Sequence, residues 1–291
     1  MAESLINTKR RINTISSTEK ITKARKLVAS VKYQRWKKRY VSNLEYAKER
    51  EETRYSALAC LTEKDKKPET RLPHNESKKR LFIVRTSTLG LCGAYNYSIF
   101  KRLDPVLTEE DELLLIGTKG ISHYQNRSYE KIEDYQDLRN RFSFGQVKHL
   151  RHQTVRLYKT GKYKEIHLVY THYKNSLNFI PKDEILLPFS PNREEADNRK
   201  KDYPPILEPN KEEVLNRTIA HYLDSLRYQK LVESEISELC SRRNARETAT
   251  DSAEQIRGEL RIQYNKSRQN AITQEITEVV AGANAGKKKE D

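Results

Sequence analysis

Apolar side chains are scarce in this chain of 291 residues: hydrophobic residues make up 35% of it, against roughly 45–50% in an average globular protein. The shortage argues against a single compact core of this size and favours long helices that bury only a narrow stripe. The sequence contains no run of about 18 apolar residues, so we expect no transmembrane helix. Residues 1–15 lack the apolar core of a secretion signal.

The three cysteines, Cys60, Cys92 and Cys240, are far apart, odd in number and without the spacing of metal ligands. This pattern indicates a reducing compartment, with neither a disulfide framework nor a zinc site. Charged residues, by contrast, make up 33% of the chain, and the net charge is +15. Residues 1–50 carry fourteen basic and four acidic side chains, whereas residues 211–291 carry fourteen of each. The basic N-terminal segment suggests an acidic partner or nucleic acid, although a solvated helix surface has the same composition.

Two long stretches have the periodicity of amphipathic helices. Residues 4–61 contain neither proline nor glycine, and apolar side chains recur there every three or four residues, as a helix stripe requires. A second stretch, residues 211–283, repeats the pattern. In the first stretch the stripe consists of Ile21, Ala24, Val28, Val31, Tyr33, Trp36, Tyr40, Leu44 and Ala47. In the second it consists of Leu215, Ile219, Tyr222, Leu226, Ala249, Ala253, Ile256, Leu260, Ile272, Ile276, Val279 and Ala283.

The segment between the two stretches, residues 80–189, alternates short β-rich runs with helical ones. This alternation predicts an α/β lobe with a largely parallel, Rossmann-like sheet. Two proline-containing linkers, residues 62–79 and 190–210, flank the lobe. We expect strands at 80–86, 112–117, 165–171 and 183–189, and helices at 95–107, 118–127 and 143–160.

Neither long helix has a wide enough apolar stripe to be stable alone. Because the lobe connects them, we expect the helix of residues 1–61 and the helix of residues 211–283 to pack antiparallel. Their near-heptad spacing favours a left-handed coiled coil. Small residues such as Ala281 and Gly282 would make the end of the second helix slender, and a basic tail follows at residues 284–291.

Motifs that carry chemistry are weak in this sequence. The segment GLCGAYN, residues 90–96, follows an expected strand, where glycines let an anion approach a helix start. It lacks the spacing of a P-loop or a dinucleotide site, so a tight turn is the simpler interpretation. His149 and His152 lie three residues apart without further metal ligands nearby. We therefore expect no catalytic residue, no cofactor, no metal site and no enzyme activity in the chain alone.

Three segments of the chain resemble the gamma, or central-stalk, subunit of F-type ATP synthases. They are KRRINTISSTEKITKARKLVA (9–29), GLCGAYN (90–96) and YNKSRQNAITQEITEVVAGA (264–283). The two terminal motifs are highly specific and occur in the right order at the right ends. Residues 100–210 match the family in layout more than in sequence. The order of helix, lobe and helix agrees with the family from end to end.

The resemblance implies a rotating shaft without catalytic sites of its own. Its partners would be a ring of three alpha and three beta subunits that hold the nucleotide sites, an epsilon-type subunit beside the lobe, and a membrane rotor ring. Rotation would couple ATP synthesis or hydrolysis to ion transport, specifically proton transport, through the membrane sector. The resemblance also implies a peripheral protein on the cytoplasmic side of the cell membrane that binds no nucleic acid.

The matching positions imply contacts with the ring of alpha and beta subunits. In the C-terminal motif these positions, which we expect on one helical side, are Arg268, Gln269, Thr273 and Glu275. In the N-terminal motif they are Lys9, Arg10, Lys20, Lys23 and Lys26. A solvated helix surface is the alternative interpretation for each of these residues.

Three positions depart from the family pattern, because Arg25, Arg243 and Arg246 stand where the family usually has methionine. We expect these arginines to face the ring, where added charge alters contact with acidic levers of the beta subunits. The departures leave open a second hypothesis, the shaft of an F1-like motor with a different mechanical output. A third, a basic coiled-coil nucleic-acid binder, follows from the eleven basic residues in 9–38, although the aromatic residues there fall on the expected buried stripe.

Overall fold

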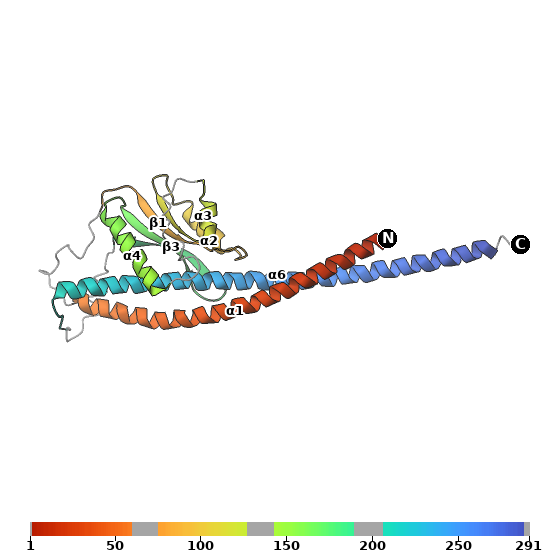
Figure 1. Cartoon of the computed structure of the whole chain (residues 1–291), viewed down its shortest axis with the longest axis horizontal. Coiled ribbons are helices and arrows are strands. Elements are labelled where there is room, and N and C mark those ends of the chain that lie inside the picture. Colours follow the sequence, from red (N-terminus) through yellow and green to blue (C-terminus); the bar gives the residue numbers. More distant parts are fainter. Residues whose placement is uncertain (1, 60–74, 127–142, 189–205, 288–291) are drawn as a thin grey trace. The chain divides into compact units, whose positions relative to one another are not determined.

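The structure is a computed structural model that describes residues 2–59, 75–126, 143–188 and 206–287. The chain divides into two compact units, which we name unit 1 (Met1–Ser30 and Arg243–Asp291) and unit 2 (Val31–Arg242). Two long helices, α1 (Ala2–Ala59) and α6 (Lys211–Lys287), contribute residues to both units (Figure 1). The two helices that the periodicity predicts are therefore present.

Local sequence accounts for the length of both helices, because neither contains the proline that would interrupt it. Asn210 precedes α6 as an N-cap: its side-chain oxygen accepts a hydrogen bond from the Glu213 amide at 2.8 Å. α6 ends at Lys287, and so includes the first residues of the tail predicted for 284–291. Most of the two predicted linkers lies outside the described residues.

Unit 2 contains a four-stranded sheet with the strand order β2-β1-β3-β4. Its strands are β1 (Arg80–Arg85), β2 (Glu112–Ile116), β3 (Glu165–Tyr173) and β4 (Phe179–Leu187). β1 pairs in parallel with β2 and β3, whereas β4 pairs antiparallel with β3. The sheet is therefore mixed, and β4 begins at Phe179 instead of the predicted 183. The connection of residues 174–178 is long enough for a hairpin but too short for the crossover that a parallel strand needs.

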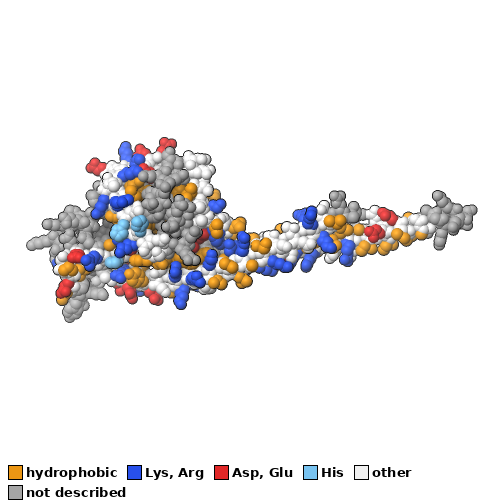
Figure 2. Space-filling view, in the orientation of Figure 1, with side chains coloured by type: hydrophobic (Ala, Val, Ile, Leu, Met, Phe, Trp, Pro, Cys, Tyr) orange, Lys and Arg blue, Asp and Glu red, His pale blue; other side chains and the backbone are white. Residues whose placement is uncertain are grey.

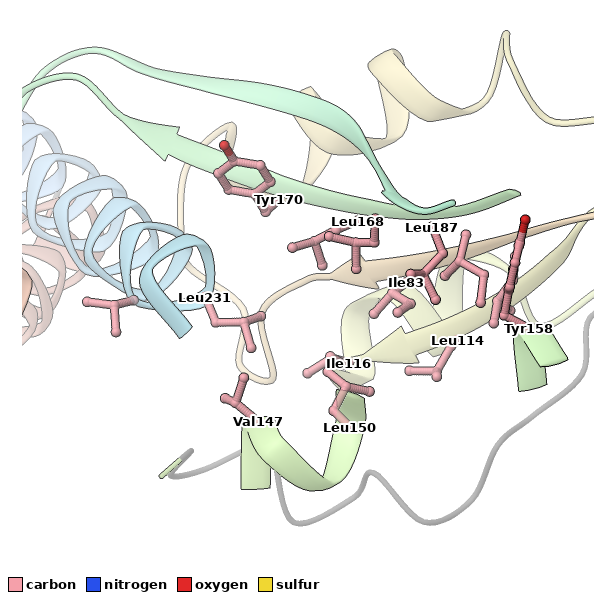
Figure 3. Packing of buried hydrophobic residues seen from close by; sticks show 14 of the residues in the cluster. Ile83, Leu114, Ile116, Val147, Leu150, Tyr158, Leu168, Tyr170, Leu187 and Leu231 are labelled. Atoms are coloured by element: carbon pink, nitrogen blue, oxygen red, sulfur yellow. The ribbon is translucent and has the colours of Figure 1, made fainter. Parts of the chain in front are cut away.

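Helices cover both faces of this sheet (Figure 1). They are α2 (Tyr95–Leu103), α3 (Thr118–His123) and α4 (Phe144–Lys159). The α2 side of the sheet is packed by Phe82 and Val84, and the α4 side by Leu81 and Ile83. Alternate residues of β1 thus point to opposite faces, as a strand requires. Figure 3 shows the cluster on the α4 side, which also contains Leu231 of α6.

The carboxyl ends of β1 and β3 lie where the strand order reverses, because the chain runs from β1 outward to β2 and then returns past β1 to β3. Sheets of this topology hold their ligands at such a position. Here α6 occupies it. The hydroxyl of Tyr95 lies 2.7 Å from Ser234 Oγ, and the Thr171 amide donates to the same oxygen at 3.3 Å. We call the place between the carboxyl ends of β1 and β3 the crevice of the sheet, and we call residues 234–242 of α6, which occupy it, the crevice segment.

α1 packs against β3 within unit 2. The hydroxyl of the buried Tyr33 lies 3.0 Å from that of Tyr173, and the ring of Tyr40 meets Tyr173 edge-on with centroids 5.7 Å apart. Trp36 is partly buried against the same core. The predicted stripe is confirmed at Tyr33, Trp36 and Tyr40, whereas Val31 is 65% exposed and lies outside it.

Candidate functional site

The residues predicted to contact the ring all belong to unit 1, where α1 and α6 run side by side. Three ion pairs join the two helices: Lys23–Glu254 at 2.6 Å, Lys26–Glu247 at 2.5 Å and Arg257–Glu19 at 2.6 Å. As the residue numbers rise along α1, those of the partners fall along α6. The two helices therefore run antiparallel in unit 1, as predicted.

Glu19 lies at the centre of this pairing, with a side chain only 6% exposed. The hydrogen bond from Lys23 lowers the pKa of Glu19; burial opposes this effect and the charge of Arg257 adds to it. Glu19 in turn raises the pKa of Lys23. Lys26 likewise lowers the pKa of Glu247 through a hydrogen bond. The basic side chains that face Glu19 and Glu247 thus favour the ionised form of these two carboxylates.

The packed stripe of α1 in unit 1 differs from the predicted stripe. Between residues 19 and 29 its less exposed residues, spaced by three and four, are Glu19, Thr22, Lys26 and Ala29, and the same spacing continues towards the N-terminus at Leu5, Thr8, Ile12 and Ile15. The predicted residues Ile21, Ala24 and Val28 are instead exposed, so the prediction was wrong here. Each residue turns a helix by about 100°, which places these apolar side chains on another face. Three of the four inward positions between residues 19 and 29 are held by polar side chains with partners on α6. One of them is Thr22, whose hydroxyl accepts a hydrogen bond from Thr250 at 3.2 Å.

Exposed apolar side chains follow α1 outside this packed stripe. Ile6 is 68% exposed, Ile21 55% and Val28 57%. A shallow hollow on the same helix is lined by Ile6, Lys9, Arg10, Asn13, Thr14 and Ser17. Figure 2 shows hydrophobic side chains interleaved with Lys and Arg along the helices of unit 1. A surface that is both apolar and basic suits a partner that offers apolar contact and acidic side chains.

The five basic residues predicted from the N-terminal motif fall into two groups. Lys9, Arg10 and Lys20 are exposed. Lys23 and Lys26 pair with carboxylates of α6 in the same chain. The first group is open to a partner, whereas the second stabilises the helix pair itself.

The four residues predicted from the C-terminal motif are all exposed along α6. Arg268 and Glu275 lie two turns apart on one row of the helix. Gln269 and Thr273 lie on another row, where the Thr273 hydroxyl donates to the Gln269 carbonyl at 2.9 Å. Because each residue turns the helix by about 100°, the four side chains fall within about 160° of its circumference, on one half of the helix.

The three arginines that replace methionine differ in their surroundings. Arg246 Nη1 donates to the backbone carbonyl of Arg25 at 3.0 Å, so it links the two helices. Arg243 is partly buried, and its Nε has no hydrogen-bond acceptor within the part of the chain that the structure describes. Among these three residues only Arg25 is exposed. The expectation that all three present charge outward is therefore corrected for Arg246, which is used inside the pair.

Sequence reasoning missed the acidic side of this pairing. Glu247 and Glu254 are seven residues apart, which puts them on one row of α6, and both meet lysines of α1. Arg257, one turn further, meets the acidic Glu19. The alternation of charge was visible in the sequence, but only the register of the two helices shows which residues meet.

In the lobe of unit 2, the GLCGAYN segment, residues 90–96, forms the turn that follows β1 and leads into α2. Leu91 and Gly93 have positive φ angles of 59° and 53°, which makes the segment a tight turn, as predicted. Cys92 within it is buried, and the side-chain amide of Asn96 donates to its Sγ at 3.2 Å. Among the described residues, no group of three or more His, Cys, Asp or Glu side chains is placed to hold a metal ion. Over the same part of the chain, no helix is long and apolar enough to cross a membrane.

Comparison with known proteins identifies relatives over almost the whole length. The family model described as ATP synthase matches residues 4–285. The ATP synthase gamma chain of Mesoplasma florum is 35% identical over 286 residues, which cover 97% of this chain and 98% of that protein. The gamma chain of Mycoplasmoides gallisepticum is 37% identical over 289 residues, which cover 96% of this chain and 99% of that protein.

Solved structures share the fold. A chain of the Euglena gracilis mitochondrial ATP synthase, in a structure of OSCP, F1 and c-ring, superposes with a TM-score of 0.66 at 16% identity and covers 98% of this chain and 95% of its own length. A chain from the central stalk and c-ring of the Tetrahymena thermophila mitochondrial ATP synthase superposes with a TM-score of 0.55 at 26% identity, covering 79% of this chain and 99% of its own. Together with the helix pair and the mixed sheet described above, these matches show that the chain belongs to the ATP synthase gamma-chain family.

Proposed function

We propose that this chain is the central rotor shaft of an ATP synthase and that unit 1 turns inside a ring of alpha and beta subunits. The observation that carries the proposal is the similarity to ATP synthase gamma chains over almost the entire length. The chain is not itself an enzyme. Its role is to couple rotation to ATP synthesis or hydrolysis in the catalytic subunits.

The helix pair of unit 1 supports a mechanical role. A single helix with a narrow stripe is unstable alone, whereas α1 and α6 are paired in unit 1, in a register that the three ion pairs described above mark. The packed residues of α1 in unit 1 are spaced by three and four, which favours a left-handed coiled coil. A paired rod of this kind resists bending and twisting better than either helix alone.

The residues that we propose as ring contacts are exposed and are not used in the ion pairs between α1 and α6 described above. They are Lys9, Arg10, Lys20, Arg25, Arg268, Gln269, Thr273 and Glu275. Exposed ion pairs contribute only about 0–1 kcal/mol each, so contacts made by these charges can be broken and remade at every rotational step. Lys23, Lys26 and Arg246 act instead within the shaft.

The lobe of unit 2 is the part that we assign to the membrane end of the rotor. Solved relatives come from structures that contain the c-ring, and the proposed partners of the lobe are an epsilon-type subunit and the membrane rotor ring. In this arrangement the protein is peripheral to the membrane, on its cytoplasmic side, and the transported ion is the proton.

Similarity to gamma chains over almost the whole length favours this function over the two alternatives. The hypothesis of an F1-like motor with another output rested on three unusual arginines, and Arg246 has a role inside the helix pair. The hypothesis of a nucleic-acid binder rested on basic charge, part of which is neutralised by Glu19, Glu247 and Glu254.

Co-expression with tagged beta subunit and the alpha subunit tests the proposal. We expect the chain to co-purify with the ring, and a bead attached through the variant Lys174→Cys, in the exposed turn between β3 and β4, to rotate when ATP is added. Arg268→Ala should lower complex yield or torque, whereas Gln263→Ala, also exposed on α6 but outside the proposed contacts, should not. A chain that does not co-purify, or that hydrolyses ATP alone, contradicts the proposal.

A further inference from the structure

A chain of buried charges connects the sheet of unit 2 to α6. Arg85, the last residue of β1, has a side chain 3% exposed, and its Nη2 lies 2.6 Å from Glu235 and 3.6 Å from Glu238. Arg242 has a side chain 8% exposed and lies 2.7 Å from Glu238. Three of the four residues belong to the crevice segment and one belongs to the sheet. Their guanidinium and carboxylate groups therefore alternate across the contact between sheet and helix.

The same segment also holds the turn that follows β1. The guanidinium of Arg242 donates to the backbone carbonyl of Leu89 at 2.6 Å and to that of Gly90. One residue earlier, the Ser241 hydroxyl donates to the Cys92 carbonyl at 2.5 Å. The backbone of the turn is thus bound to α6 at three carbonyl groups within four residues. These bonds fix the turn at a definite position along the helix and around it.

Stability alone does not explain why charges occupy this position. Leu231, Val232 and Ile236 already join α6 to the sheet through apolar packing. Outside the crevice segment, ion pairs also link α6 to the lobe, namely Lys230–Glu184, Arg151–Asp224 and His172–Glu233. Buried ion pairs are poor sources of stability, because removing charges from water costs several kcal/mol per ion, and apolar replacements of similar volume are often neutral or stabilising. The cost is visible at Glu238, whose pKa is raised by burial against the opposing charge of Arg85.

Directional contacts supply something that apolar packing does not. Burial of apolar surface is non-directional, so it opposes separation of two surfaces more than it opposes sliding. Charge-assisted hydrogen bonds to a guanidinium are short and demand a particular geometry. Along the chain, the last strand of the sheet, β4, is connected to α6 by the residues between Leu187 and Lys211. Force that passes directly from the sheet to α6 must therefore cross side-chain contacts.

We propose that Arg85, Glu235, Glu238 and Arg242 form the joint through which torque passes between the lobe and α6. This inference rests on the proposed function, because torque arises only if the chain is a rotor. The joint occupies the crevice where sheets of this topology otherwise bind a ligand. Its role is to fix the rotational register of lobe and helix while the apolar core holds them together.

The test replaces the charges by apolar side chains of similar volume in the complete ATP synthase, reconstituted into sealed vesicles. The variant is Arg85→Met, Glu235→Leu and Glu238→Leu combined. We expect the complex to assemble and to hydrolyse ATP at a rate near that of the wild type. We expect ion pumping per ATP hydrolysed to fall, because the lobe slips more easily relative to α6 under load when only the ion pairs outside the crevice segment remain.

A matched control removes a buried ion pair that lies within the lobe. Arg80 lies 2.6 Å from Asp111, whose side chain is 1% exposed, and both residues belong to the lobe. The variant Arg80→Met with Asp111→Leu should change thermal stability without changing the ratio of pumping to hydrolysis. A purely structural role of Arg85 would give both variants the same profile.

The outcomes separate the joint from the rotor function itself. Wild-type complex that hydrolyses ATP without pumping refutes the proposed function. Coupled pumping in the triple variant, in a preparation where the wild type pumps, refutes the joint. If the triple variant does not assemble, Arg85→Lys decides: it keeps the charge but loses the forked geometry of the guanidinium. Reduced pumping per ATP in Arg85→Lys supports the joint, and unchanged pumping overturns it.

Discussion

Substitution of Gly258 can measure how much the helix propensity of a single residue contributes to the stability of α6 in unit 1. It lies inside α6, is exposed, and a Cβ built on it meets no heavy atom within 4 Å. Glycine in a helix interior costs about 1 kcal/mol relative to alanine. Because alanine introduces no clash here, Gly258→Ala should recover nearly all of that free energy.

The assay is hydrogen exchange of backbone amides in the purified full-length chain. A stabilisation of about 1 kcal/mol corresponds to roughly a fivefold lower population of the locally open state. Amides around position 258 should therefore exchange about fivefold more slowly in Gly258→Ala, by the same relation between stability and opening. Ala249→Gly, also exposed in α6, should produce the opposite shift of similar size.

An unchanged or faster exchange in Gly258→Ala would refute this reasoning. It would mean that the backbone at this position departs from an ordinary helix in solution, where a side chain is harmful. The Ala249→Gly control separates that case from an insensitive assay, since its amides should still exchange faster.

Three further predictions concern unit 2. Burial lowers the pKa of His167, but a hydrogen bond to Asp183 at 2.8 Å helps to raise it overall. The free energy of unfolding that this raised pKa contributes is fully present below the ordinary histidine pKa of about 6.5 and is lost as pH rises through the pKa of the folded state. In urea titrations His167→Gln should therefore show a free energy of unfolding that depends less on pH above about 6.5 than that of the wild type. An unaltered pH profile would contradict this. Tyr33→Phe removes the hydrogen bond between the hydroxyl of Tyr33 on α1 and that of Tyr173 on β3. It should lower the free energy of unfolding, measured in urea titrations, by about 0.5–1.5 kcal/mol. An unchanged free energy of unfolding would argue that this bond is absent in solution. Gly117→Ala should cost at least about 3 kcal/mol, because φ is +112° and a Cβ would lie 2.2 Å from the Thr86 carbonyl oxygen; soluble protein with a wild-type melting temperature would count against the geometry of this turn.

The order of helix, lobe and helix could be predicted because it depends on local pattern. Long stretches without proline, and short β-rich runs between helical ones, fix the elements almost independently of their neighbours. β4 begins at Phe179, but the apolar run at 183–189 led us to expect a strand that begins four residues later. This later start hid the short connection to β3, from which the antiparallel direction of β4 could have been inferred.

The helix face that packs in unit 1 could not be predicted from apolar spacing. Ile21 and Val28 form a regular apolar row, yet they are exposed, while the charged Glu19 is buried. A buried carboxylate is tolerable only where a partner neutralises it, and its partner Arg257 is far away in sequence. The spacing of apolar residues therefore predicted an amphipathic helix correctly, but it did not predict which row of side chains packs against α6.

The crevice segment escaped prediction for a related reason. Ser234, Glu238 and Arg242 are polar, and polar residues on a helix normally indicate a solvated face. Glu238 and Arg242 meet charges and acceptors on β1 and the following turn, and Ser234 meets Tyr95 of α2, all more than a hundred residues away. Only the tertiary arrangement distinguishes such a row from an exposed one.

The occupation of the sheet's crevice by α6 has a consequence for signalling. Ser241 and Arg242 of α6 already bind the carbonyl groups of the turn after β1. A ligand that entered the crevice between the ends of β1 and β3 would have to displace α6 itself. At this place the rotor therefore transmits the position imposed by its neighbours instead of responding to a bound ligand.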